Sequence, residues 1–263
     1  MDLRKTLFVL PNMITLASVF CGFNSIRLAG GAQGGGEDLQ RAAVLLIFAM
    51  FFDLLDGRVA RLTKTQSAFG LQIDSLADVI SFGVAPALLA YQWVLYRSPV
   101  FGLFTAFVFV ACATIRLARF NVLASAPSGE PVKPSKYMLG LPSPPAAGVV
   151  ISLVVADSAL GGVIGDERHT AILFVVTIAV SLLMVSNVKF RSFKDLSMNP
   201  ATVLLVLFVL GSSAFVWQRY RPELVLTWLL GVYVLLGIFE TLRLFAIKLR
   251  AAPRDTVPPT AAE

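Results

Sequence analysis

The sequence predicts an all-α, polytopic membrane protein with about eight transmembrane helices. Of the 263 residues, 57% are apolar and only 14% are charged, and the mean hydropathy is +0.78. An average soluble domain is about a quarter charged, so this composition excludes an ordinary water-soluble globule. At about 20 residues per membrane crossing, the chain has room for about six to nine helices, which excludes a large domain outside the membrane.

Eight apolar segments, separated by charged or Gly/Pro-rich breaks, are the predicted helices. They cover residues 6–29, 42–62, 72–96, 98–120, 141–157, 170–188, 200–217 and 224–246. We expect residues 1–249 to form a single transmembrane domain. The Pro/Ala-rich end, 250–263, is a predicted disordered tail in the cytoplasm.

The basic residues predict the orientation in the membrane. An even number of helices places both termini on one side, and 16 of the 22 Lys and Arg residues then fall on that side. Because basic residues concentrate in cytoplasmic loops, we expect cytoplasmic termini in the cell (inner) membrane. The net charge of +6 comes from short clusters between apolar segments. This distribution is not the continuous basic face of a nucleic-acid-binding protein.

Four aspartates lie inside apolar segments, where each carboxylate costs at least about 2.5 kcal/mol. Asp53 and Asp56 lie three residues apart near the end of the second segment, and Asp74 and Asp78 lie four apart in the third. These spacings place each pair on one helix face. A short link makes the two helices antiparallel neighbours, so we expect the pairs to meet near the cytoplasmic surface.

Four ionised carboxylates in one pocket repel one another unless protons or cations relieve the repulsion. Two divalent cations balance four negative charges, and all-oxygen ligands favour Mg²⁺ or Mn²⁺ over zinc. Paired divalent cations serve phosphoryl-type displacement reactions. Between the pairs, Gly57, Ala60 and Gly70 leave room for a bulky ligand, while Arg61 and Ser67 have donors for phosphate oxygens. The alternative is that the glycines only allow close helix packing.

Two motifs around these aspartates resemble a known signature. DLLDGRVAR at 53–61 and GLQIDSLAD at 70–78 match the pattern of the CDP-alcohol phosphatidyltransferase family without a gap. Flanking words resemble the bacterial integral-membrane branch of this family whose acceptor is serine. They are LPNMIT at 10–15, FCGF at 20–23, DSLADVISFGVAPAL at 74–88, RLARFN at 116–121 and GLPSPPAAG at 140–148.

The resemblance implies transfer of a phosphatidyl group from CDP-diacylglycerol to an alcohol, with release of CMP. It implies that Asp53, Asp56, Asp74 and Asp78 hold the two metal ions, and that Asp78 also takes the proton from the acceptor hydroxyl. The implied CDP-diacylglycerol-binding residues are Asn12, Thr15, Gly57, Ala60, Arg61, Ser67 and Gly70. Members of the family usually work as homodimers.

Serine as the acceptor requires a cation for its carboxylate. Arg116 and Arg119, three apart at the cytoplasmic end of the fourth segment, are the candidates, with Asn121 and Lys136 beside them. We hypothesise that one arginine binds the serine carboxylate and the other a lipid phosphate. The alternative is that each arginine only anchors the helix end at the membrane surface.

Other functions stay open at this point. Glycerol 3-phosphate or inositol phosphate would call for a denser basic pocket, and choline for an aromatic cage. A cation-coupled transporter also uses carboxylates inside the membrane, but usually carries an internal repeat that this chain lacks. The only histidine is His169, which excludes a route through paired histidines and favours direct displacement.

Overall fold

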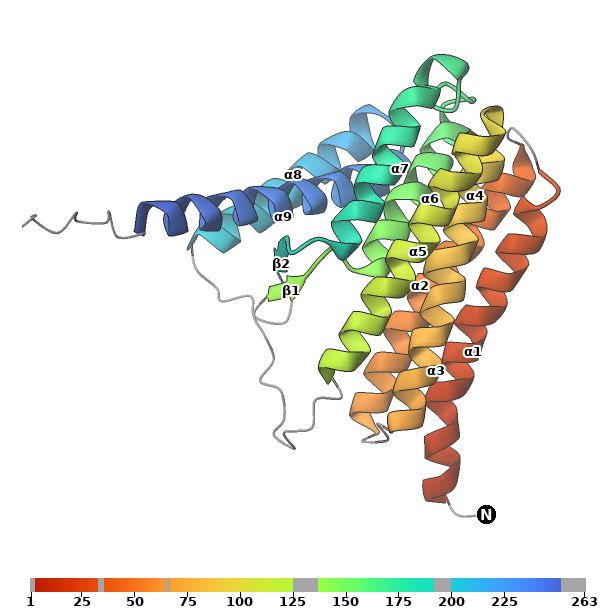
Figure 1. Ribbon diagram of the computed structural model, residues 1–263, viewed down its shortest axis with the longest axis vertical. Coiled ribbons are helices and arrows are strands. Elements are labelled where there is room, and N and C mark those ends of the chain that lie inside the picture. The colour runs from red at the N-terminus through yellow and green to blue at the C-terminus, as the bar shows by residue number, and fades with distance from the viewer. Residues whose placement is uncertain are drawn as a thin grey trace, which may run out of the picture.

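The computed structural model describes residues 3–32, 36–63, 65, 67–124, 137–191 and 200–251. Helices α1 to α7 stand side by side as a bundle, and α8 and α9 form an antiparallel pair that lies obliquely against it (Figure 1). The long elements in chain order are α1 (Leu3–Ala29), α2 (Glu37–Leu62), α3 (Ala68–Asp78), α4 (Ala85–Trp93), α5 (Pro99–Ala124), α6 (Ser143–Ala159), α7 (Thr170–Val185), α8 (Pro200–Arg219) and α9 (Leu224–Ala251). Short 3₁₀ turns lie at Leu95–Arg97 and Glu167–His169.

The predicted helical membrane fold is confirmed. Each of the eight apolar segments corresponds to a long helical segment among the described residues. Four of these are long and apolar enough to cross a membrane, namely Val9–Ala29, Ala68–Trp93, Pro99–Val122 and Glu167–Val185. Helix α2 has the length, but its apolar stretch carries the charged side chains of Asp53, Asp56 and Arg58. The predicted tail lies outside the described residues from 252 onward.

The third segment is one rod with a change of helix type in its middle. A π-helical stretch, η1 (Val79–Val84), joins α3 to α4 directly after Asp78. The Ala85 N–H donates to the Ile80 carbonyl, five residues back. Pro86 follows at once, and its missing N–H removes one ordinary α-helical hydrogen bond. The π stretch therefore lies between the aspartates and the apolar upper half of the rod.

Two short strands form a feature that the sequence did not indicate. Strand β1 (Tyr137–Leu139), which precedes α6, pairs antiparallel with β2 (Lys189–Arg191), which follows α7. The Gly140 N–H donates to the Val188 carbonyl at 2.9 Å, and Gly140 has a φ of 77°, a conformation that favours glycine. The strand pair ties the start of α6 to the end of α7.

Small residues bring α1 close to its neighbours. The Ser18 hydroxyl donates to the Ala49 carbonyl at 3.1 Å, and the Ser25 hydroxyl donates to the Ala42 carbonyl at 2.9 Å. On another face of α1, a Cβ at Gly22 would lie 2.8 Å from Ser81 Oγ and 3.0 Å from Ser81 Cα in the π stretch. Inside a membrane the hydrophobic effect does not drive helices together. Small residues instead let their backbones approach closely and pack.

The end of the bundle opposite the N-terminus is held by a buried carboxylate. Asp157 Oδ2 accepts from the Trp93 indole N–H at 2.7 Å, and Oδ1 accepts from the Gly165 N–H at 2.8 Å. These bonds join α6, α4 and the turn before α7. Asp157 is thereby satisfied without a cation.

Substitution Gly22→Ala tests the contact between α1 and the π stretch. The added Cβ meets Cα and Oγ of Ser81, so α1 must shift, and we expect a loss of about 1–3 kcal/mol of unfolding free energy. The measurement is the Tm in detergent. Gly211→Ala is the matched control, because a Cβ there meets nothing within 4 Å. Equal Tm values for the two variants would contradict the described contact.

Candidate active site

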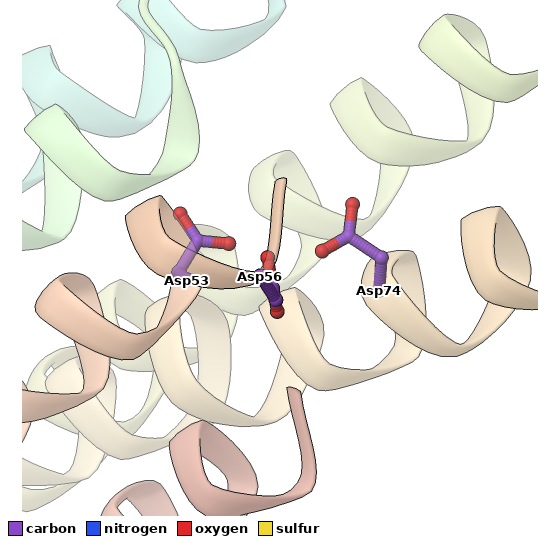
Figure 2. A group of neighbouring side chains, drawn as sticks. All are labelled: Asp53, Asp56 and Asp74. Carbon is purple, nitrogen blue, oxygen red and sulfur yellow. The ribbon is translucent and has the colours of Figure 1, made fainter. Parts of the chain in front are cut away.

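Three of the four aspartates form one cluster. Asp53 and Asp56 come from successive turns of α2, and Asp74 comes from α3; each offers a carboxylate oxygen, and these oxygens all lie within 4.8 Å of one another. Figure 2 shows the carboxylates of Asp53 and Asp74 facing each other from the two helices, with Asp56 between them. Asp56 is only 4% exposed, and the other two are partly buried. The expected meeting of the two helices is confirmed for these residues.

Asp78 lies at the edge of this cluster. It is the last residue of α3, one turn beyond Asp74, and its carboxyl group is within hydrogen-bond reach of Asp53. It interacts electrostatically with Asp74 and, with the opposite sign, with the guanidinium of Arg116 on α5. Asp78 therefore links the carboxylate cluster to a basic group from another helix.

Helix α1 contacts the cluster through one hydroxyl. Thr15 Oγ1 lies 2.6 Å from Asp56 Oδ2 and 3.1 Å from the carbonyl oxygen of Pro11 on its own helix. A hydroxyl has a single proton, and an ionised carboxylate is the stronger acceptor. Thr15 thus donates to Asp56, and this contact holds the buried carboxylate in place.

A pocket of about 470 Å³ opens beside Asp56 and Asp74. Its lining residues come from α1, α2, α3 and the link between the last two. They are Pro11, Asn12, Thr15, Asp56, Gly57, Ala60, Thr65, Ser67, Ala68, Gly70, Leu71 and Asp74. Six of the seven residues predicted to bind CDP-diacylglycerol are in this list. The seventh, Arg61, is exposed, and its Nε donates to the Gly57 carbonyl at 2.9 Å.

The two glycines of the signature have different surroundings. A Cβ at Gly57 would meet nothing within 4 Å, so no helix packs there and close packing does not explain this glycine. A Cβ at Gly70 would lie 3.2 Å from Ser67 Oγ and 3.5 Å from Asn12 Oδ1. Ser67 is the N-cap of α3, and its hydroxyl accepts from the Gly70 N–H at 3.0 Å. Ser67 and Gly70 thus shape the start of α3 at the pocket.

Arg116 lies where several helices meet. Its Nη1 donates to the hydroxyl of Ser143, the first residue of α6, at 2.6 Å. It also interacts electrostatically with Asp78 on α3. Its Nε is buried and has no hydrogen-bond partner among the described residues. A buried donor left without a partner costs about 1–3 kcal/mol, so this position fits an anionic ligand.

The other residues predicted for the acceptor site have different surroundings from those of Arg116. Arg119 is exposed, and its Nη2 donates to Asn187 Oδ1 at 3.0 Å, beyond the end of α7. Asn121 exchanges a hydrogen bond at 2.9–3.0 Å with the hydroxyl of Ser75, which joins α5 to α3 between Asp74 and Asp78. Lys136 lies outside the described residues. Among the described members of this set, Arg116 interacts with an aspartate, and Asn121 reaches α3 through Ser75.

Sequence reasoning missed two residues of this region. Thr65 is buried in the pocket, and its hydroxyl lies 2.7 Å from that of Thr63. Ser143 lies inside the GLPSPPAAG word, which carried the family resemblance but indicated no role for this serine.

Comparison with known proteins gives consistent results. A protein of Helicobacter pylori (strain ATCC 700392 / 26695) is 39% identical over 236 residues, which cover 90% of this chain and 92% of the relative. Proteins of Mycobacterium leprae and Bacillus subtilis are 34% and 31% identical, over 81% and 70% of this chain and 68% and 91% of their own lengths. All three are named CDP-diacylglycerol–serine O-phosphatidyltransferase. The family model for CDP-alcohol phosphatidyltransferase matches residues 8–246, and the chain belongs to that family.

Proposed function

We propose that this membrane protein transfers the phosphatidyl group of CDP-diacylglycerol to the hydroxyl of L-serine, giving phosphatidylserine and CMP. The observations that carry the proposal are the carboxylate cluster of Asp53, Asp56 and Asp74 beside the pocket, and the buried Nε of Arg116, which has no hydrogen-bond partner among the described residues. One side of this arrangement suits a diphosphate with its cations, and the other suits an acceptor with a carboxylate. The names of the relatives agree with this assignment.

The carboxylate cluster fits two divalent cations, Mg²⁺ or Mn²⁺. Its donors are all carboxylate oxygens close enough to share ions, and hard cations prefer such donors. Asp53, Asp56 and Asp74 would hold the ions, with Asp78 at the edge. When bound, the ions would neutralise charge on the diphosphate and on the departing CMP. Without cations, the cluster would hold adjacent like charges that repel one another.

Asp78 is the proposed general base. A serine hydroxyl is a weak nucleophile at neutral pH, and a carboxylate within hydrogen-bond reach removes its proton as the new bond forms. Serine Oγ bonds to the phosphorus that carries the diacylglycerol, the bond from that phosphorus to the CMP oxygen breaks, and the proton passes to Asp78. No covalent enzyme intermediate is needed.

The pocket beside Asp56 and Asp74 is the proposed CDP-diacylglycerol site. Its lining by glycine, alanine and short polar side chains leaves room for a nucleotide. Asn12, Thr15 and Ser67 bring polar atoms to this pocket. Arg61, exposed at its rim, has a free guanidinium end for a phosphate, because only its Nε is engaged with Gly57 among the described contacts.

Arg116 is the proposed ligand of the serine carboxylate. Its buried Nε lacks a partner among the described residues, and a planar guanidinium matches a carboxylate. Arg119, exposed one turn later on α5, is the proposed contact for a lipid phosphate, and Asn121 and Lys136 are proposed to contribute to the same acceptor and phosphate site. The proposed setting is the cytoplasmic surface of the inner membrane, where soluble serine meets a lipid donor, and the proposed assembly is a homodimer.

An acceptor screen tests the proposed function. Purified protein with Mn²⁺ or Mg²⁺ and CDP-diacylglycerol is expected to release CMP with L-serine at least about tenfold faster than with glycerol 3-phosphate, inositol phosphate or choline. The readout is CMP. Release with glycerol 3-phosphate and none with L-serine would overturn the choice of acceptor.

Removal of the metal or of one ligand tests the cluster. We expect EDTA to abolish CMP release and excess Mn²⁺ or Mg²⁺ to restore it, and Asp56→Ala to lower kcat at least about a hundredfold. Asp38→Ala is the control, since Asp38 lies on the same helix but is exposed in a surface ion pair with Arg41. Full activity in EDTA, or in Asp56→Ala, would rule out the metal assignment.

Substitution Gly57→Leu tests the donor pocket. Because a Cβ at Gly57 has open space, the leucine side chain is expected to fill the pocket and lower activity by about tenfold or more without lowering the Tm. Gly211→Leu, at an open position on α8, is the matched control. Unchanged kinetics with CDP-diacylglycerol would show that the donor binds elsewhere.

A further inference from the structure

Two contacts of α5 place Arg116 at the level of the proposed base. Asn121, near the end of α5, exchanges a hydrogen bond at 2.9–3.0 Å with Ser75, three residues before the base on α3. One turn before Arg116, Ala113 Cβ lies 3.5 Å from where a Cβ at Gly83 would be, in the π stretch that follows the base. The two segments therefore run antiparallel, and both contacts enclose the arginine and the base between them.

The guanidinium of Arg116 is held by a serine of another helix. Its Nη1 donates to the Ser143 hydroxyl at 2.6 Å, and Ser143 is fully buried at the first position of α6. Nη1 lies on the side of the guanidinium away from the Nε N–H, and Nε has no hydrogen-bond partner among the described residues. A guanidinium binds a carboxylate along one edge through parallel N–H···O bonds. The bond to Ser143 thus engages a different edge from the one that carries the Nε N–H.

The backbone on both sides of Ser143 is constrained. Pro142, with a φ of −60°, precedes it, and two prolines follow it, so ring closure restricts the chain around the serine. Just upstream, the Leu141 N–H donates to the Leu183 carbonyl of α7 at 2.9 Å, and β1 pairs with β2. Ser143 is therefore a fixed point of the fold. An arginine side chain bonded to it has lost rotational freedom before any ligand binds.

We propose that Ser143 is a positioning residue of the acceptor site: it holds the Arg116 guanidinium so that the Nε edge receives the carboxylate of the acceptor. This inference rests on the proposed function, in which Arg116 binds that carboxylate, and it adds the start of α6 to the acceptor site. Fixation of the guanidinium before binding lowers the entropy cost of binding and raises the affinity for the acceptor. Because the carboxylate stays bound throughout the reaction, the effect falls on KM and not on kcat.

Kinetics of the full-length Ser143→Ala variant test the proposal. The change removes the hydroxyl that Nη1 contacts and leaves Arg116 in place. We expect the KM for L-serine to rise about tenfold, while kcat and the KM for CDP-diacylglycerol stay within about twofold and the Tm within a few degrees of wild type. Ser181→Ala is the matched control and should leave all of these values unchanged. Ser181 is also fully buried, but its hydroxyl donates to the Thr177 carbonyl of its own helix.

A second variant, Ser143→Cys, separates the hydrogen bond from packing. A thiol fills the space of the hydroxyl but is only a weak acceptor, so the KM for L-serine should rise in this variant as well. An unchanged KM for L-serine in either folded Ser143 variant would overturn the proposal. An equal rise in the KM for CDP-diacylglycerol would do the same, because it would indicate a general disturbance of the structure.

A double-mutant cycle with Arg116→Met shows whether Ser143 acts through Arg116. If it does, the double variant has the same kcat/KM for L-serine as Arg116→Met alone, whereas multiplicative effects of the two changes would contradict the positioning role. Wild-type turnover with L-serine tests the proposed function by itself, and the drop in kcat/KM for L-serine in Arg116→Met tests the role of the arginine. Failure of the proposed function is therefore distinguishable from failure of the role of Ser143.

Discussion

The structure depends on holding like-charged carboxylates together inside an apolar bundle. Asp53, Asp56 and Asp74 bring their oxygens within 4.8 Å of one another on helices that otherwise pack with small and apolar side chains. Repulsion and desolvation both oppose this arrangement. The neighbouring contacts relieve it in part: Thr15 donates to Asp56, and Arg116 faces Asp78. The close packing of α1 on α2, through serine hydroxyls and alanines, keeps these partners in place.

The aspartates also divide the site into two regions. Asp56 and Asp74 line a pocket formed by α1, α2 and α3, whereas Asp78 interacts with Arg116, which donates to Ser143 at the start of α6. Under the proposed function, the lipid nucleotide occupies the first region and the amino acid the second. Substrates of very different polarity then approach the same carboxylates without competing for one surface. Most residues of the first region belong to the family signature. The second region forms through contacts between residues that are distant in the sequence.

The sequence predicts best those features that depend only on residues close to one another in the chain. Apolar segments and the spacings of three and four residues define the helices and the faces of Asp53, Asp56, Asp74 and Asp78, because these depend only on helix geometry. The role of Gly57 is ambiguous in the sequence, which allows either helix packing or a ligand pocket. The structure shows open space where a Cβ at this position would lie. Arg116 and Arg119 look equivalent in sequence, yet one turns to Asp78 and the other to Asn187. The strands β1 and β2, three residues each and separated in the sequence by residues 140–188, depend on long-range pairing that no local pattern reveals.

The π stretch at Val79–Val84 gives the two halves of the third rod a rotational offset from each other. Each extra residue in a π turn rotates the following segment by about 100° relative to an unbroken α-helix. The lower half can thus orient Asp74 and Asp78 for chemistry while the upper half orients Trp93 and its neighbours for packing. The third segment therefore consists of two α-helical halves that differ in rotational phase.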